Sequence, residues 1–386
     1  MANDLAAAMH RAAQALRVSD VKSATSLIQN ALFRRPTDPV EEPGDGGHEE
    51  DPRSSKTHFS GLPRRPLKEV LAALSQHRKM TGAFSALSGR KTHAAPPVAD
   101  GAQFLDRRFT NSAGTRTFKL YIPAAIRGGE IARGLIVMLH GCQQDPDDFA
   151  VGTNMNAQAD KHGLIVAYPE QTAAANPSAC WNWFKPADQH RDDGEPSILA
   201  GITSALVAEF ALDPRKVFVA GLSAGGAMAV VMGETYPELY RGVGIHSGLA
   251  YRSANDVVSA FAAMRGDARS ASPSNVESSA SRPRLPRTIV FHGTADQTVH
   301  PVNAGKIVAA TVAHGAGDLE RQQRGETDGR SFTRTVAIGP EGIPTVECWL
   351  IDGAGHAWSG GSAPGSFTDA KGPSASAEMV RFFLEE

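Results

Sequence analysis

Residues 221–225 constrain the fold of this chain more than any other segment. They read Gly-Leu-Ser-Ala-Gly, follow the apolar run 217–220 directly, and precede a segment, 226–232, that we expect to be helical. A G-x-S-x-G sequence between a strand and a helix is typical of a nucleophile elbow, in which small residues allow a strained turn to lift a serine hydroxyl out of the sheet. The pattern predicts Ser223 as a nucleophile; a glycine- and serine-rich turn without chemistry is the alternative interpretation.

Length and composition allow one large α/β domain with an appendage, or two domains, in 386 residues of which 41% are hydrophobic. Lys and Arg number 39 against 41 Asp and Glu, so charge gives no reason to expect nucleic acid or an anionic membrane as a partner. No run approaches the roughly 20 apolar residues that a membrane-spanning helix needs. We therefore expect neither a nucleic-acid partner nor a transmembrane segment.

The N-terminal residues 1–11 include the acidic Asp4 and lack both a basic region and an unbroken apolar region. That pattern is not typical of a secretory signal peptide, so we expect a cytoplasmic protein.

The chain has three cysteines, Cys142, Cys180 and Cys348, which are too few for a disulfide framework and lack metal-site spacing. Cys348 lies in an apolar run and is expected to be a buried structural thiol. A bridge between Cys142 and Cys180 is conceivable and would favour an oxidising compartment, against the cytoplasmic expectation. The sequence leaves this question open.

The chain divides near residue 100, into an extension, residues 1–100, and a larger domain, residues 101–386. Apolar residues recur at helical spacing in 4–33 and 66–87, whereas 34–62 is rich in Pro, Gly and charge and resembles a flexible linker. The helical, partly disordered extension is either a docking element or a poorly ordered appendage.

From about residue 104, predicted strands and helices alternate. Several of the strands are continuous apolar runs, as expected for a mostly parallel sheet covered by helices on both faces. Residues 267–286, dense in Ser, Ala, Arg and Pro, are expected to form an exposed insertion. The predicted strands are 117–122, 135–140, 164–168, 217–221, 242–246, 288–292 and 345–351, and the predicted helices are 148–162, 196–210, 224–236, 302–314 and 375–384.

Two residues downstream of Ser223 complete a catalytic triad in the order Ser, Asp, His that α/β-hydrolases use. Asp296 follows the predicted strand 288–292, and His356 lies in a glycine-flanked loop after the predicted strand 345–351. Ligand sites of parallel sheets form at the carboxyl ends of strands, so these loops share one edge of the sheet. We therefore predict that His356 is the base and that Asp296 orients it.

Other acids and histidines fit these roles less well. Asp352 begins the same loop as His356 and would orient its ring poorly. His246 and His292 are interpreted as structural residues that form hydrogen bonds at strand ends. Three further acids lie in polar segments that we expect to be loops: Asp267, Asp318 and Asp328.

An oxyanion formed during acyl transfer needs two backbone N–H donors. The predicted strand 135–140 ends in a His140-Gly141 turn, which would place one N–H at the oxyanion, and Ala224, directly after the nucleophile, supplies the other.

Five separated segments carry a family resemblance: 139–144 (Leu-His-Gly-Cys-Gln-Gln), 180–184 (Cys-Trp-Asn-Trp-Phe), 221–228 (Gly-Leu-Ser-Ala-Gly-Gly-Ala-Met), 292–296 (His-Gly-Thr-Ala-Asp) and 355–361 (Gly-His-Ala-Trp-Ser-Gly-Gly). In this order they resemble the polyhydroxybutyrate depolymerase family of esterases, over roughly residues 105–386. The resemblance implies an α/β-hydrolase fold, the triad Ser223, Asp296 and His356, and the amides of Cys142 and Ala224 as oxyanion hole.

We expect a serine esterase that needs neither a metal ion nor an organic cofactor and acts on poly- or oligo(3-hydroxybutyrate). A feruloyl or acetylxylan esterase is the alternative within the fold, and a non-catalytic binding scaffold is the alternative outside it. Many members of the resembled family are extracellular, which is the alternative location. Three tryptophans either line an acyl-binding cleft or serve ordinary packing: Trp181, Trp183 and Trp358.

Overall fold

A computed structural model describes residues 95–267, 285–314 and 319–385 of the chain. The helices predicted within 4–33 and 66–87, the linker, Asp318 and most of the predicted insertion lie outside the described residues. The boundary near residue 100 stays a prediction.

The described residues form a ten-stranded sheet in the order β1-β2-β4-β3-β5-β6-β7-β10-β9-β8. The six strands from β4 to β10 in this order are parallel, whereas β1 and β2 at one side and β9 and β8 at the other are antiparallel to their neighbours. The strands are β1 Gln103–Asn111, β2 Gly114–Ile122, β3 Gly134–Leu139, β4 Leu164–Pro169, β5 Val217–Leu222, β6 Gly242–His246, β7 Arg287–Gly293, β8 Leu319–Thr327, β9 Arg330–Ile338 and β10 Pro344–Ile351. A separate pair joins β11 Trp358–Ser359 to β12 Thr368–Asp369.

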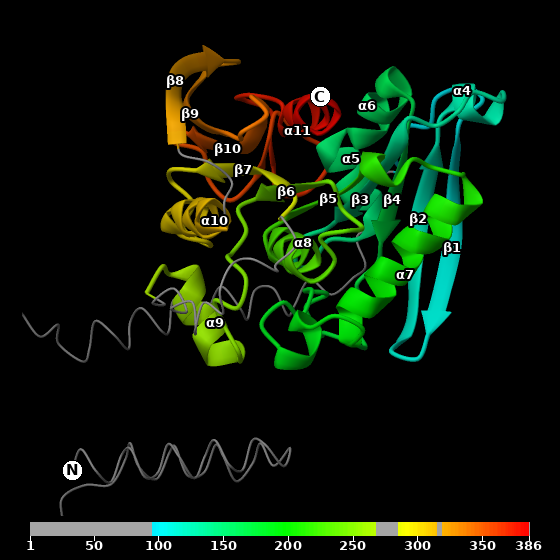
Figure 1. The fold of residues 1–386 in the computed structure, drawn as a ribbon, viewed down its shortest axis with the longest axis horizontal. Coiled ribbons are helices and arrows are strands. Elements are labelled where there is room, and N and C mark those ends of the chain that lie inside the picture. Colours follow the sequence, from blue (N-terminus) through cyan, green and yellow to red (C-terminus); the bar gives the residue numbers. More distant parts are fainter. Residues whose placement is uncertain (1–94, 268–284, 315–318, 386) are drawn as a thin grey trace, which may run out of the picture. The chain divides into compact units, whose positions relative to one another are not determined.

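Helices cover both faces of the sheet (Figure 1). Alternate side chains of β3 show why: Leu135 and Val137 belong to one apolar cluster and Ile136 and Met138 to the other, so both faces need a cover. The first cluster takes in α7 Gly194–Glu209, α8 Ala224–Thr235 and α10 Val302–Ala313, and the second takes in α5 Pro146–Thr153, α6 Met155–His162 and α11 Ala375–Leu384. Shorter helices are α4 Ala124–Arg127, η1 Pro186–Gln189, η2 Pro214–Lys216 and α9 Val257–Met264.

The predicted helix 148–162 is wrong in one respect, since the structure breaks it into α5 and α6. Asn154 adopts the left-handed conformation with φ 53° and ends α5, with its N–H bonded to the carbonyl of Ala150. Asn is among the residues that tolerate this conformation. The sequence also missed strands β1, β8 and β9 and helix α9, which lie at the margins of the fold; the three strands lack continuous apolar runs.

The prediction for Cys348 is confirmed, because its thiol is free and buried, and burial raises its pKa to about 12. Among the described residues, no helix has both the length and the apolar character needed to cross a membrane.

Candidate active site

The predicted site residues meet at one edge of the parallel sheet. Ser223 follows β5, Asp296 lies three residues beyond β7, and His356 follows β10. Since β5, β6, β7 and β10 are successive parallel neighbours, their carboxyl ends lie at the same edge. Cys142 follows β3, which is the neighbour of β5 on the other side.

The turn at residues 221–225, here called the elbow, has the strained geometry expected of a nucleophile. Ser223 has φ 58° and ψ −119°, a combination that non-glycine residues rarely adopt. A Cβ on Gly225 would lie 2.0 Å from the carbonyl oxygen of Leu139, and one on Gly221 would lie 2.4 Å from the backbone of Gly225. Both glycines of the motif are therefore needed for the close approach of backbones.

The structure joins Asp296 to His356. The ring Nδ1 of His356 lies 2.7 Å from Oδ2 of Asp296, and the other oxygen of Asp296 accepts the backbone N–H groups of Thr298 and Val299 at 2.9 Å each. A carboxylate only accepts here, so Nδ1 carries the proton and Nε2 is left with its lone pair. Burial alone would raise the pKa of the Asp296 carboxyl, but the neighbouring histidines, His292 and His356, hold it well below its usual range.

His246, on β6, connects the elbow to the loop of residues 352–369, here called the histidine loop. Its carbonyl accepts the N–H of Ser223 at 2.8 Å, and its ring Nε2 accepts the N–H of Ser359 at 3.0 Å. Burial, with the nearby His292 and His356, lowers the pKa of His246 to about 3, so the ring is neutral and can accept. Within the described residues Ser223 Oγ makes no hydrogen bond to His356, a contact that often forms only with substrate.

The oxyanion loop, residues 140–144, is held rigidly. His140 is fully buried, its Nε2 accepts the N–H of Gln171 at 3.0 Å, and its Nδ1 donates to the carbonyl of Gly141 at 2.7 Å. That carbonyl shares a planar trans peptide with the N–H of Cys142, so fixing one fixes the direction of the other. Neither the Cys142 N–H nor the Ala224 N–H bonds to another described residue, which leaves both free for a ligand.

The bridge that the sequence left open is present, because Cys142 and Cys180 form a disulfide. It ties the oxyanion loop to the segment before Trp181, whose ring lies 5.8 Å from that of His140, centroid to centroid.

The three tryptophans are buried in this structure. Trp181, Trp183 and Trp358 are 0%, 5% and 1% exposed and belong to the apolar clusters. Trp358 stacks on His246 and donates from its indole to Ser376 at 3.1 Å. Burial of this extent favours the packing interpretation over an acyl-cleft role, because no ring face is left for a ligand.

The competing acids that the structure describes are exposed, and the competing histidine His292 forms a hydrogen bond at the end of its strand. Asp352 is exposed at the start of the histidine loop, and Asp328 lies in the turn between β8 and β9. Asp267 lies in the coil after α9. His292 bonds through Nε2 to the carbonyl of Val299 at 2.8 Å, as expected of a strand-end residue, and its Nε2 also lies 3.4 Å from Asp296.

Sequence reasoning missed a buried polar cluster that joins the oxyanion loop to the histidine loop. Gln144 accepts the N–H of Gly141 at 2.9 Å and donates to Asp148 at 3.0 Å and to the carbonyl of Ser366 at 3.1 Å. Asp148 in turn accepts the N–H of Ser366 at 2.8 Å and its hydroxyl. Ser366 lies 218 positions from Asp148, so no local pattern could reveal the contact.

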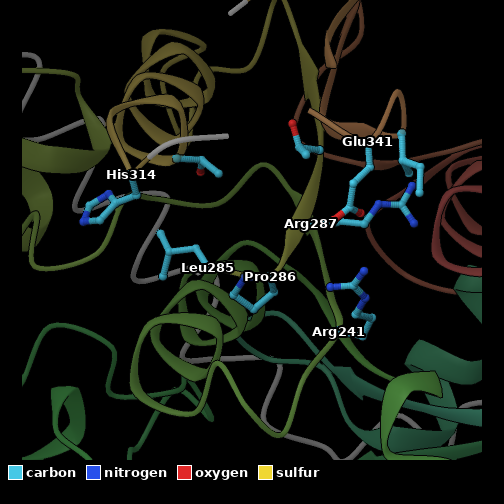
Figure 2. Close-up of a pocket in the computed structure, with 9 residues that line it drawn as sticks. Arg241, Leu285, Pro286, Arg287, His314 and Glu341 are labelled. Atoms are coloured by element: carbon cyan, nitrogen blue, oxygen red, sulfur yellow. The ribbon is translucent and has the colours of Figure 1, made fainter. Parts of the chain in front are cut away.

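Among the described residues, no three His, Cys, Asp or Glu side chains gather closely enough to hold a metal ion. Figure 2 shows a pocket beside Arg241, Arg287 and Glu341, at the amino ends of β6 and β7 and so away from Ser223. Its volume of about 20 Å³ suits a single water molecule and excludes an ester substrate.

Known proteins are similar to this chain in sequence. Residues 116–324 match the family described as Esterase PHB depolymerase. Poly(3-hydroxyalkanoate) depolymerase C of Paucimonas lemoignei is 32% identical over 258 residues, which cover 64% of this chain and 59% of that protein. Acetylxylan esterase A of Talaromyces purpureogenus is 29% identical over 212 residues, covering 50% of this chain and 52% of that protein. The chain thus spans less than two thirds of the length of either relative.

The fold has a counterpart among solved structures. An acetyl xylan esterase from Aspergillus awamori superposes with a TM-score of 0.55 at 20% identity, covering 73% of this chain and 98% of that one. At this identity the likeness concerns the fold, and it supports the α/β-hydrolase class predicted from sequence. The family match spans more than half of the chain and includes Ser223 and Asp296, so the chain belongs to the polyhydroxybutyrate depolymerase family of esterases.

Proposed function

We propose that this protein is a serine esterase that hydrolyses carboxylic esters through an acyl-enzyme. The observation that carries the proposal is the 2.7 Å contact between His356 Nδ1 and Asp296, at the sheet edge where the strained elbow presents Ser223. It leaves Nε2 of His356 able to take a proton, which is what a serine nucleophile requires.

In the first step His356 takes the proton of the Ser223 hydroxyl as the oxygen attacks the ester carbonyl. The N–H groups of Cys142 and Ala224 stabilise the oxyanion that forms, a contribution of about 3 kcal/mol for each donor. The carbon–oxygen bond to the alcohol then breaks, and His356 returns the proton to the departing oxygen. Water, deprotonated by the same ring, then attacks the acyl carbonyl; the bond to Ser223 breaks and His356 returns the proton to the Ser223 oxygen, while the Asp296 carboxylate stabilises the imidazolium in both steps.

Hydrolysis of p-nitrophenyl butyrate by the full chain tests the mechanism. Ser223→Ala should lower kcat by about 10⁴-fold or more, because the nucleophile is lost while the fold is kept. Absence of hydrolysis by the wild type, or full activity of Ser223→Ala, would overturn the proposal.

The substrates that we propose are short-chain 3-hydroxyalkanoate esters, as oligomers or polymer. The family match and the relative named poly(3-hydroxyalkanoate) depolymerase C support this class. The relative named acetylxylan esterase A supports a carbohydrate ester as second candidate. Clearing of polyhydroxybutyrate granules, measured beside release of acetate from acetylated xylan and of ferulate from feruloylated xylan, separates the two.

We also infer that the protein works in an oxidising compartment, in place of the cytoplasmic location expected from the N-terminal sequence. The Cys142–Cys180 disulfide supports this location, because disulfides seldom persist in a reducing cytosol. Mass spectrometry of protein alkylated in its native compartment tests the inference. A disulfide protects Cys142 and Cys180 from alkylation, so labelling of both cysteines would contradict it.

Residues 1–100 are proposed as an extension separate from the catalytic domain. Limited proteolysis should remove most of them while p-nitrophenyl butyrate hydrolysis persists.

A further inference from the structure

Phe367 places an apolar ring at the surface beside the proposed base. The side chain is 42% exposed, and its ring centroid lies 6.4 Å from that of His356, with the two planes at 79°. Neither the sequence pattern nor the triad accounts for this ring.

The backbone of Phe367 is strained. Its φ of 52° lies in the left-handed region, which glycine occupies freely and bulky side chains rarely adopt. Such strain persists only where neighbouring contacts enforce it, and it concentrates at functional sites. Here the carbonyl of Phe367 accepts the N–H of Trp358 at 2.7 Å.

Buried polar groups fix the residue immediately before the ring. Ser366 is bonded through its N–H and hydroxyl to Asp148 and through its carbonyl to Gln144. Asp148 is 0% and Gln144 4% exposed, so this cluster is shielded from water and holds the turn firmly. The histidine loop is therefore built to present a phenyl ring at a position where glycine would fit without strain.

The chemistry of the triad indicates which part of an ester would meet this ring. His356 delivers its proton to the departing alcohol oxygen, so side chains beside the His356 ring face the alcohol portion of the substrate. We propose that Phe367 is a specificity-determining residue that contacts this alcohol portion and favours esters with an apolar group next to the ester oxygen. The proposal rests on the esterase function proposed above.

A kinetic consequence separates this role from a structural one. The alcohol leaves during acylation and is absent during deacylation. Loss of the phenyl ring should therefore slow acylation and leave deacylation unchanged. If Phe367 only positioned His356, acylation and deacylation would slow together, because the imidazole of His356 acts in both steps.

Two variants of the full chain test the proposal. Phe367→Gly removes the ring and suits a positive φ, so folding is not at risk; Phe367→Leu keeps an apolar side chain. We expect Phe367→Gly to lower kcat/KM for benzyl butyrate roughly three- to tenfold, the size of one aromatic contact, while methyl butyrate changes less than about twofold. Phe367→Leu should lie between this variant and the wild type. The burst of p-nitrophenolate from p-nitrophenyl butyrate should slow with an unchanged steady-state deacylation constant.

Phe261→Ala is the matched control, since Phe261 on α9 is 57% exposed and loses a phenyl ring from a different surface. It should leave the benzyl-to-methyl ratio unchanged. An unchanged ratio in Phe367→Gly, or equal slowing of acylation and deacylation, would overturn the inference while leaving the esterase proposal intact. A wild type that hydrolyses none of these esters would instead contradict the proposed function.

Discussion

The elbow and the histidine loop hold their catalytic side chains in different ways. The elbow is held by backbone contacts: it lies between strand β5 and helix α8, the N–H of Ser223 bonds to the carbonyl of His246, and its two glycines allow the close approach of other backbone, such as the carbonyl of Leu139. The histidine loop is held by side chains far away in the chain. Asp296 lies 60 positions from His356, and Asp148 lies 218 positions from Ser366.

This difference predicts different consequences of mutation. The elbow is specified by backbone contacts, so a side chain added at either of its glycines disturbs the fold before it disturbs the chemistry. The histidine loop depends on individual side-chain hydrogen bonds, so each can be removed while the fold is kept. The predictions below test that distinction, from the largest expected effect to the smallest.

Asp296→Asn removes the carboxylate of the triad, which holds His356 from another loop. The asparagine keeps an oxygen for Thr298 and Val299 but cannot stabilise an imidazolium, so kcat should fall about 10⁴-fold with little change in Tm. Hydrolysis of p-nitrophenyl butyrate and thermal unfolding measure the two quantities. Asp352→Asn, at an exposed position at the start of the histidine loop, is the control and should retain activity. If Asp352→Asn were the inactive variant, the assignment of Asp296 would be wrong.

Gly225→Ala tests the elbow. Its new Cβ would meet the carbonyl oxygens of Leu139 and His140 at 2.0 and 2.5 Å, so backbone must move. We expect the free energy of unfolding to fall by about 3 kcal/mol or more, measured in urea. Gly305→Ala in α10 is a matched control, because its Cβ meets nothing within 4 Å and alanine favours helix by about 1 kcal/mol. Equal stability of both variants would contradict a backbone-specified elbow.

The same distinction explains what could be predicted from the sequence. The central parallel strands could be predicted because several are continuous apolar runs bounded by turn residues, as in β5. Ser223, Asp296 and His356 could be predicted because each lies within a few residues of the end of a predicted strand, in the order that hydrolases use.

The buried polar cluster and Phe367 depend on contacts that sequence spacing does not encode. Gln144, Asp148 and Ser366 carry no motif and meet only when β3 and β10 are aligned in one sheet. Phe367 could not be predicted because its exposure and its φ are imposed by those contacts. The sequence also could not decide the role of the tryptophans, because a large aromatic ring near a motif is as readily a core residue as a ligand contact.

Asp148→Asn tests whether the buried polar cluster supports the histidine loop. The asparagine fits the same volume but lacks one acceptor for Ser366, so the turn before Phe367 loosens. Displacement of this loop by a fraction of an ångström should lower kcat by up to about 10²-fold. Steady-state hydrolysis and circular dichroism measure activity and fold together. Asp147→Asn, one position earlier on α5 in a half-exposed ion pair with Lys119, should change neither. Unaltered kcat in Asp148→Asn would show that the cluster does not support catalysis.

His246 connects the two regions, and its titration affects stability only in acid. Its pKa in the folded protein is about 3, below the ordinary value of about 6.5, so the unfolded chain takes up this proton first as the pH falls. Stability from this residue is therefore complete above about pH 6.5 and is lost between there and about pH 3, by up to about 1.4 kcal/mol per pH unit.

His246→Gln keeps a side-chain oxygen that can accept the N–H of Ser359 and does not titrate. Its Tm should fall less between pH 7 and pH 4 than that of the wild type, although it can be lower at pH 7 because the ring no longer stacks on Trp358. His314→Gln, at an exposed position, should keep the wild-type pH dependence. If both variants followed the wild-type curve, protonation of His246 would not be what loosens the connection between the elbow and the histidine loop in acid.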